Sequence, residues 1–201
     1  MGRIKKRILF PFLLVILISG FLGYYIIQTP LHEMGHYVFA YAFNQNAIKG
    51  VSLPYEKLSG ASLIDVVSAS VNYSYPMTDS FSIPQIFLIA FAGFLFELAY
   101  MTGVMFIIRK LLSGVKSIGG IYLVSILFGF YMMSFTILAG WFNIFNPNAD
   151  VYKIVLSSPS IYTGILVVSA AEVFAAFYYM VNIRNVSKNY LATIKKIYHQ
   201  G

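Results

Sequence analysis

The chain has 201 residues, of which 59% are hydrophobic and only 10% are charged, and its mean hydropathy is +0.74. Because a soluble domain carries about 25% charged residues, this composition excludes a water-soluble globular protein and predicts an integral membrane protein. The net charge of +7 comes mainly from basic residues that flank apolar runs. No motif for binding nucleic acid accompanies them, so nucleic acid is not an expected partner.

The first predicted element is an apolar helix over residues 8–28, which carry no charged side chain. At about 1.5 Å per residue this helix covers roughly 30 Å, the thickness of the hydrocarbon core of a bilayer. We interpret it as a retained membrane span, because it is longer than the apolar region of a signal peptide and no small-residue cleavage site follows. Threonine caps helices well and proline suits the first helical position, so Thr29 and Pro30 predict a new or kinked helix over 30–43.

The least apolar part of the chain is the insertion over residues 44–83, where Gly, Ser, Asn and Pro separate short apolar runs. Runs such as SLIDVVSASVNYSY predict a β-hairpin or a pair of strands lying near the membrane. Further membrane spans are predicted over 84–108, 118–142 and 160–183. A polar, helix-breaking segment lies at 143–153, and a basic tail follows the last span.

The predicted fold class is an all-α polytopic membrane protein with about four to five transmembrane helices and a small β-like insertion. Residues 1–201 are expected to form a single membrane-embedded domain of a multi-pass protein, with the cell membrane as its location. Three basic clusters lie at residues 3–7, 109–116 and 184–196. If 30–43 continues the first span, these clusters fall on one side of the membrane, as the positive-inside rule requires. If 30–43 crosses separately, Arg109, Lys110 and Lys116 lie outside, against that rule; both arrangements stay open.

The most specific pattern in the chain is the motif HEMGH at residues 32–36, directly after the first apolar run. Positions i and i+4 of a helix face the same side, so His32 and His36 would present two imidazoles to one point. A catalytic zinc ion takes three protein ligands and leaves a fourth position for water. Glu33 is placed to act on that water rather than to bind the metal. The competing interpretation is an interfacial helix whose polar residues face water.

A third ligand would have to come from elsewhere in the chain. The chain has no cysteine, which excludes thiolate ligands, disulfides and a thiol nucleophile, and the remaining histidine, His199, lies in the terminal tail. Asp150 is the best carboxylate candidate, because it follows an Asn- and Pro-rich segment, and irregular backbone at membrane depth is tolerated where it lines a cavity. On the residues alone, a polar loop with aspartate as a turn residue is equally favoured.

These segments together resemble the site-2-protease family of intramembrane zinc metalloproteases, over about residues 20–155. HEMGH matches the family's H-E-x-x-H helix. Ala92-Gly93 matches part of the family's Ala-Gly-Pro motif, and NIFNPNADV matches part of its Asn-x-x-Pro…Leu-Asp-Gly segment. The chain departs from the family at Phe94, which replaces the proline, and at Ala149 and Val151, which replace the residues on either side of the aspartate.

The resemblance implies a role for each matching residue. His32, His36 and Asp150 would be the zinc ligands, and Glu33 would be the general base. Asn143 or Asn146 would be a candidate to hold the substrate carbonyl or the oxyanion.

Two further carboxylates, Glu97 and Glu172, are expected inside membrane spans, where a charge is costly and usually faces the interior of the bundle. Each could orient a histidine or belong to a proton or water path. The favoured interpretation is a protonated glutamate that is hydrogen-bonded between helices.

The expected function is that of a zinc-dependent intramembrane endopeptidase, with Zn²⁺ as cofactor and with a membrane protein substrate and the lipid bilayer as partners. His and carboxylate ligands make zinc the default metal. The alternative is a catalytically inactive metal-binding membrane scaffold or transporter. Glu33 separates the two, because hydrolysis needs an acid beside the first histidine and a metal carrier does not. A channel lined by Glu97 and Glu172 would not need HEMGH at all.

Overall fold

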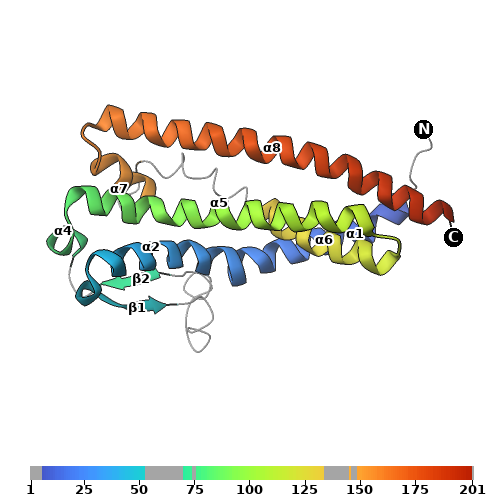
Figure 1. Cartoon of the computed structure of the whole chain (residues 1–201), viewed down its shortest axis with the longest axis horizontal. Helices are drawn as coiled ribbons and strands as arrows, with labels where there is room; N and C mark the ends of the chain where they lie inside the picture. Colours follow the sequence, from blue (N-terminus) through green and yellow to red (C-terminus); the bar gives the residue numbers. More distant parts are fainter. Residues whose placement is uncertain (1–5, 53–69, 74–75, 134–144, 146–148, 201) are drawn as a thin grey trace. The chain divides into compact units, whose positions relative to one another are not determined.

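The structure is a computed structural model, and it describes residues 6–52, 70–73, 76–133, 145 and 149–200 (Figure 1). It is mainly α-helical, with one small two-stranded sheet, as predicted. The elements in chain order are α1 (Lys6–Gly23), the π-helical turn η1 (Tyr24–Gln28), α2 (Thr29–Phe43), the 3-10 turn η2 (Gln45–Ala47), β1 (Ile48–Ser52), β2 (Ser70–Tyr73), α4 (Met77–Ser80), α5 (Ile83–Gly114), α6 (Ile118–Met133), α7 (Asp150–Leu156) and α8 (Ile161–Gln200).

Three helical stretches of the described chain are long and apolar enough to cross a membrane, by length and composition: Leu9–Phe43, Ile83–Gly114 and Ile161–Tyr198. A shorter apolar helix covers Ile118–Met132. The span predicted over 118–142 extends beyond this helix into residues outside the described part. The last helix is longer than the span predicted over 160–183, because α8 continues through the basic tail to Gln200.

The first apolar helix and the motif helix follow each other without a break in helical backbone. The predicted cap at Thr29 is wrong: Thr29 is the first residue of α2, and Gln28 stands at the N-cap with helical φ and ψ of −67° and −49° and no capping side-chain bond. The π-helical turn η1 supplies the change of geometry that the sequence suggested as a kink. Pro30 is the second residue of α2 and lies in its first turn, the part of a helix that tolerates proline.

The predicted strands are present in the insertion, where β1 and β2 pair antiparallel and contact α2 (Figure 1). Val51 lies opposite Val71, and the register shifts between Ile48 and Gly50, which is a β-bulge. Gly50 has a φ of +147°, a backbone conformation that side chains with a Cβ rarely adopt. Residues 53–69 of the insertion are outside the described part.

The chain forms two compact units, each with its own packing. The first comprises Met1–Tyr24, Tyr100–Phe135 and Ala176–Gly201. Its helices α1 and α6 approach closely: a Cβ on Gly129 would lie 2.1 Å from Ser19 Oγ.

The second unit comprises Tyr25–Ala99 and Thr136–Ala175, and it contains the motif helix. One of its apolar clusters joins α5 to α7 and α8 through Ala90, Ile154 and Val168. The other joins α2, α5 and the insertion through Ala40, Phe81 and Ile89.

Candidate metal centre

The two histidines of the motif lie one helical turn apart on α2, as their i and i+4 spacing dictates. Their Nε2 atoms are 3.0 Å apart, and their rings stand almost perpendicular to each other. His36 is buried, with 5% of its surface exposed, and His32 is partly buried. The two ring nitrogens therefore converge on one point inside the second unit.

Asp150 is the third member of the cluster, and its first-turn position in α7 brings it to the histidines. Its Oδ2 lies 3.0 Å from Nε2 of His32 and 3.0 Å from Nε2 of His36. The helix-breaking segment predicted over 143–153 therefore ends earlier than expected, because α7 begins at Asp150. Within the described part of the chain, these three residues form the group whose ligand atoms could hold a metal ion.

A backbone carbonyl fixes which nitrogen of His36 faces the cluster. Nδ1 of His36 lies 2.6 Å from the carbonyl oxygen of Ile89 in α5, so Nδ1–H donates to that oxygen. In the neutral imidazole this leaves Nε2 as a lone pair directed at Asp150. A lone pair and a carboxylate oxygen 3.0 Å apart repel each other unless a proton or a metal cation lies between them. The donor set therefore suits a cation.

Glu97 lies near Nδ1 of His32, as the Ile89 carbonyl lies near Nδ1 of His36. Its Oε1 lies 3.5 Å from Nδ1 of His32, which is within ion-pair distance but not a hydrogen bond. Gln28, at the end of η1, donates a 3.2 Å hydrogen bond from Nε2 to the same Oε1. Both Glu97 and Gln28 are buried. The hydrogen bond between helices that was predicted for Glu97 is therefore present, and its protonation stays a prediction; the carboxyl group also lies beside a candidate ligand.

The predicted Ala92-Gly93 pair explains how α5 comes so close to α2. A Cβ on Gly35 would lie 2.5 Å from the carbonyl oxygen of Ala92, and a Cβ on Gly93 would lie 2.6 Å from Cε1 of His32 and 2.7 Å from Cε1 of His36. Both imidazoles therefore pack directly against the backbone of Gly93. Neither glycine position has room for a side chain.

Lys153, one turn along α7, holds the other oxygen of the aspartate. Its Nζ donates to Oδ1 of Asp150 at 3.1 Å, which leaves Oδ2 for the histidines. Burial raises the pKa of the Asp150 carboxyl. Hydrogen bonds with His32 and His36 and the positive charge of Lys153 outweigh burial, so the pKa is held well below its usual range. Asp150 is therefore ionised and available as a ligand at neutral pH.

Glu33 faces the insertion as well as the cluster. Its Oε2 accepts a 3.1 Å hydrogen bond from the backbone N–H of Val71 in β2. Its carboxylate also interacts electrostatically with His36, His32 and Asp150. The residue predicted as a general base is thus beside the cluster but is not among its three converging ligand atoms.

The donor set fits the predicted zinc ion. A tetrahedral zinc ion bound at 2.0–2.1 Å holds its ligand atoms roughly 3.3 Å apart. The three edges of the triangle between the two Nε2 atoms and Oδ2 are 3.0 Å each, so only small movements would be needed.

The remaining predicted site residues have different outcomes. Asn143 and Asn146 lie outside the described residues. Glu172 is buried in α8, where it lines an apolar cavity. Lys153 was not predicted as a site residue, although its i and i+3 spacing from Asp150 could have indicated the contact. The Ile89 carbonyl and the Val71 N–H were not predicted either, because no sequence pattern marks a backbone group.

Comparison of the chain with models of protein families, with curated proteins and with solved structures gave no match.

Proposed function

We propose that this chain is an integral membrane, zinc-dependent endopeptidase that hydrolyses peptide bonds of membrane-spanning polypeptides. The observation that carries the proposal is the convergence of His32 Nε2, His36 Nε2 and Asp150 Oδ2, with the carboxylate of Glu33 beside them. The resemblance to the site-2-protease family assigns the same residues to the same roles.

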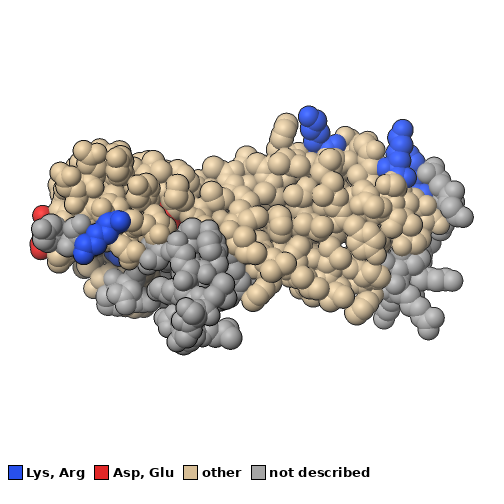
Figure 2. Space-filling model, turned by 90° about the horizontal axis from the view of Figure 1, so that it is seen from below, with Lys and Arg blue, Asp and Glu red and all other residues tan. Residues whose placement is uncertain are grey.

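The membrane setting is supported by the surfaces of the long helices. Large apolar side chains are exposed along them, among them Leu17 at 71%, Phe106 at 68% and Phe177 at 70%. On the face drawn in Figure 2, charged side chains occupy only small areas of the described surface. Such apolar surface is costly in water and favourable in lipid. We therefore propose a multi-pass protein in which the three long helical stretches and the shorter helix α6 cross or enter the bilayer.

In the proposed reaction His32, His36 and Asp150 would hold the zinc ion. The bound ion supplies a Lewis acid that polarises the scissile carbonyl and lowers the pKa of a water molecule. Glu33 takes a proton from this water onto its carboxylate while the water oxygen bonds to the carbonyl carbon. The same proton then passes from Glu33 to the amide nitrogen as the C–N bond breaks, which releases a carboxylic acid and an amine. Ile89 and Glu97 hold the two imidazoles in position throughout.

The edge of β2 offers a place for the substrate backbone. In an antiparallel pair, the N–H and C=O of one residue point to the same side. The Val71 N–H is bonded to Glu33, so at this residue the side of β2 that is turned away from β1 faces the motif helix α2. We infer that an extended substrate segment lies along this side of β2, with its peptide bond beside Glu33.

The second candidate function is a metal-binding membrane scaffold that retains polypeptides without cleaving them. The Val71–Glu33 hydrogen bond favours it, because that bond occupies one oxygen of the carboxylate. The two functions share the metal site and differ in whether Glu33 transfers a proton.

The test begins with the metal content of the detergent-purified protein, measured by mass spectrometry beside His36→Ala and Asp150→Ala. The proposal expects one zinc ion per chain in the wild type and loss of zinc in both variants. Zinc-loaded protein is then incubated with a peptide library derived from a digested proteome, beside Glu33→Gln as the matched control. Cleavage by the wild type and not by Glu33→Gln, at equal zinc content, supports the enzyme. Zinc binding without cleavage in either protein supports the scaffold.

A further inference from the structure

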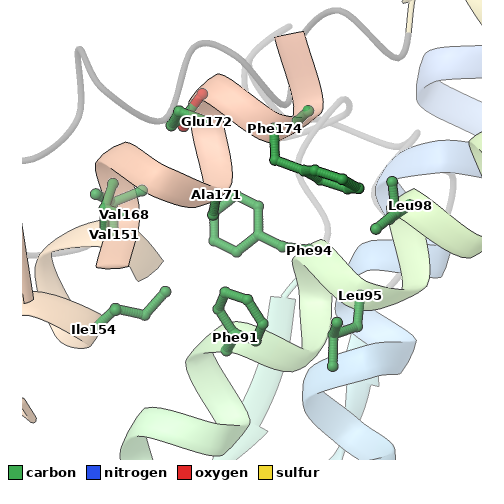
Figure 3. Close-up of a pocket in the computed structure, with 11 residues that line it drawn as sticks. Phe91, Phe94, Leu95, Leu98, Val151, Ile154, Val168, Ala171, Glu172 and Phe174 are labelled. Carbon is green, nitrogen blue, oxygen red and sulfur yellow. The ribbon is translucent and has the colours of Figure 1, made fainter. Parts of the chain in front are cut away.

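A second feature of the same unit, an apolar cavity of about 210 Å³, lies among α5, α7 and α8 (Figure 3). Phe91 and Phe94 of α5 line it, together with Val151 and Ile154 of α7 and Ala171 of α8. Ten of its eleven described lining residues are hydrocarbon side chains, and the remaining one is Glu172. A charged group placed among these walls would lose its hydration, so the cavity selects an apolar occupant.

Two of the residues that line the cavity connect its walls to the candidate metal centre. The ring of Phe94 packs edge-on against the imidazole of His32, with ring centroids 5.5 Å apart, and Phe94 directly follows Gly93. On the other wall, Val151 directly follows Asp150. Two of the lining residues are therefore chain neighbours of residues that contact or form the cluster. A group that enters the cavity therefore contacts a ring that packs directly against His32.

The size of the cavity defines the size of its occupant. An apolar cavity of about 150 Å³ in another protein stays dry and binds benzene, so about 210 Å³ is enough for the side chain of leucine, methionine or phenylalanine. An apolar side chain that fills the cavity supplies the van der Waals contacts that its walls lack, which provides binding energy.

We propose that this cavity binds one bulky apolar side chain of the polypeptide substrate, next to the scissile bond, and so selects the cleavage site. The inference rests on the proposed endopeptidase function and adds the class of residue that it recognises. In a membrane-spanning substrate such residues are abundant, so the cavity selects by shape and size rather than by charge.

The test compares Ala171→Phe, which fills the cavity, with Val173→Phe on the same helix, whose side chain is 69% exposed. Both variants and the wild type are loaded with zinc and incubated with the proteome-derived peptide library, and the cleaved bonds are identified by mass spectrometry. We expect leucine, methionine and phenylalanine to be enriched at one position beside the bond cleaved by the wild type. Because a change of one methylene in an apolar pocket alters selectivity by about 10- to 200-fold, Ala171→Phe should lose at least tenfold at these bonds and retain those with alanine there. Val173→Phe should cleave as the wild type does.

A variant that enlarges the cavity distinguishes a change in substrate recognition from a loss of folding. Phe91→Ala enlarges the cavity, and it should raise cleavage at bonds flanked by tryptophan relative to leucine, which a damaged fold cannot do. Cleavage with no preference at any position, or the same preference in Ala171→Phe and Val173→Phe, would overturn the cavity inference and leave the endopeptidase in place. Absence of Glu33-dependent cleavage in the zinc-loaded wild type would instead overturn the proposed function itself.

Discussion

The backbone N–H of Val71 donates a 3.1 Å hydrogen bond to Oε2 of Glu33, which ties the strand pair to the proposed general base. The donor is a main-chain group, so only a proline at position 71 removes it. Because this N–H points to Glu33, proline at this edge position does not remove a bond between the two strands.

We expect Val71→Pro to lower the rate of peptide cleavage about tenfold or more, since a hydrogen bond to a charged group contributes about 1.5–3 kcal/mol. Zinc content should not change, because Val71 does not contact the cluster's ligand atoms. The matched control is Val71→Thr, which keeps both the β-branched shape and the N–H and should cleave normally. Equal rates for the two variants would show that the bond does not position Glu33.

The contact between Gly93 and both imidazoles leads to a second prediction. A Cβ at this position would lie 2.6–2.7 Å from atoms of His32 and His36, so Gly93→Ala must displace the rings or separate α5 from α2. We expect zinc affinity to fall at least tenfold, because overpacking of this kind costs about 1–3 kcal/mol. The measurement is competition for zinc with a coloured chelator.

Gly103→Ala on the same helix is the control for this prediction. A Cβ there meets no atom within 4 Å, so the substitution changes helix propensity alone. It should bind zinc as the wild type does and unfold at an equal or higher temperature. If Gly93→Ala also binds zinc normally, the approach of α5 to α2 is looser than the structure has it.

The spacing of the motif was sufficient to predict that His32 and His36 face one point, because i and i+4 positions share a helix face whatever the tertiary structure. The apolar runs likewise predicted the long helices, and the punctuation of residues 44–83 predicted the strands. These features depend on local sequence, and the structure contains them.

Other features depend on contacts between distant segments, and the sequence alone could not define them. Asp150 lies 114 residues from His36, and on its own residues it was equally well a turn residue in a loop. The Ile89 carbonyl and the Val71 N–H are backbone groups that every non-proline residue possesses, so no residue type marks them. Thr29 and Pro30 predicted a kink or a new helix but not the π-helical turn, because Thr-Pro also suits the start of an ordinary helix.

Lys153 is predicted to hold Asp150 in the orientation that directs Oδ2 to the histidines. Lys153→Met removes the 3.1 Å contact to Oδ1 while it keeps the aliphatic stem. Loss of a residue that hydrogen-bonds to a metal ligand typically lowers metal affinity about 10- to 100-fold, and we expect zinc affinity to fall about tenfold here. Lys153→Arg retains a donor and should restore most of the affinity. Identical dissociation constants for the three proteins, measured by chelator competition, would rule out this role.

Glu97 gives a comparable prediction for His32, with Glu172 as a matched control, because each is a buried glutamate on an apolar helix. Glu97→Gln replaces the carboxylate 3.5 Å from Nδ1 of His32 with a neutral amide, and zinc affinity should fall about 10- to 100-fold. Glu172→Gln, in the cavity lining, should leave zinc affinity unchanged. A fall in unfolding temperature without a change in zinc affinity would show that Glu97 acts only in packing, through its hydrogen bond with Gln28.

Removal of the metal provides the last prediction, and its readout does not depend on catalysis. A ligand that binds only the folded state stabilises it by RT ln(1 + [L]/Kd), which is about 4 kcal/mol when the free ion exceeds Kd a thousandfold. A chelator should therefore lower the unfolding temperature of the wild type and of Glu33→Gln by several degrees, and added zinc should restore it. His36→Ala and Asp150→Ala should already unfold at the lower temperature and should not respond to chelator or zinc, because each variant lacks one of the three proposed metal ligands. A wild type that unfolds at one temperature with and without chelator, in buffer that contains zinc, would contradict the assignment of these residues as metal ligands.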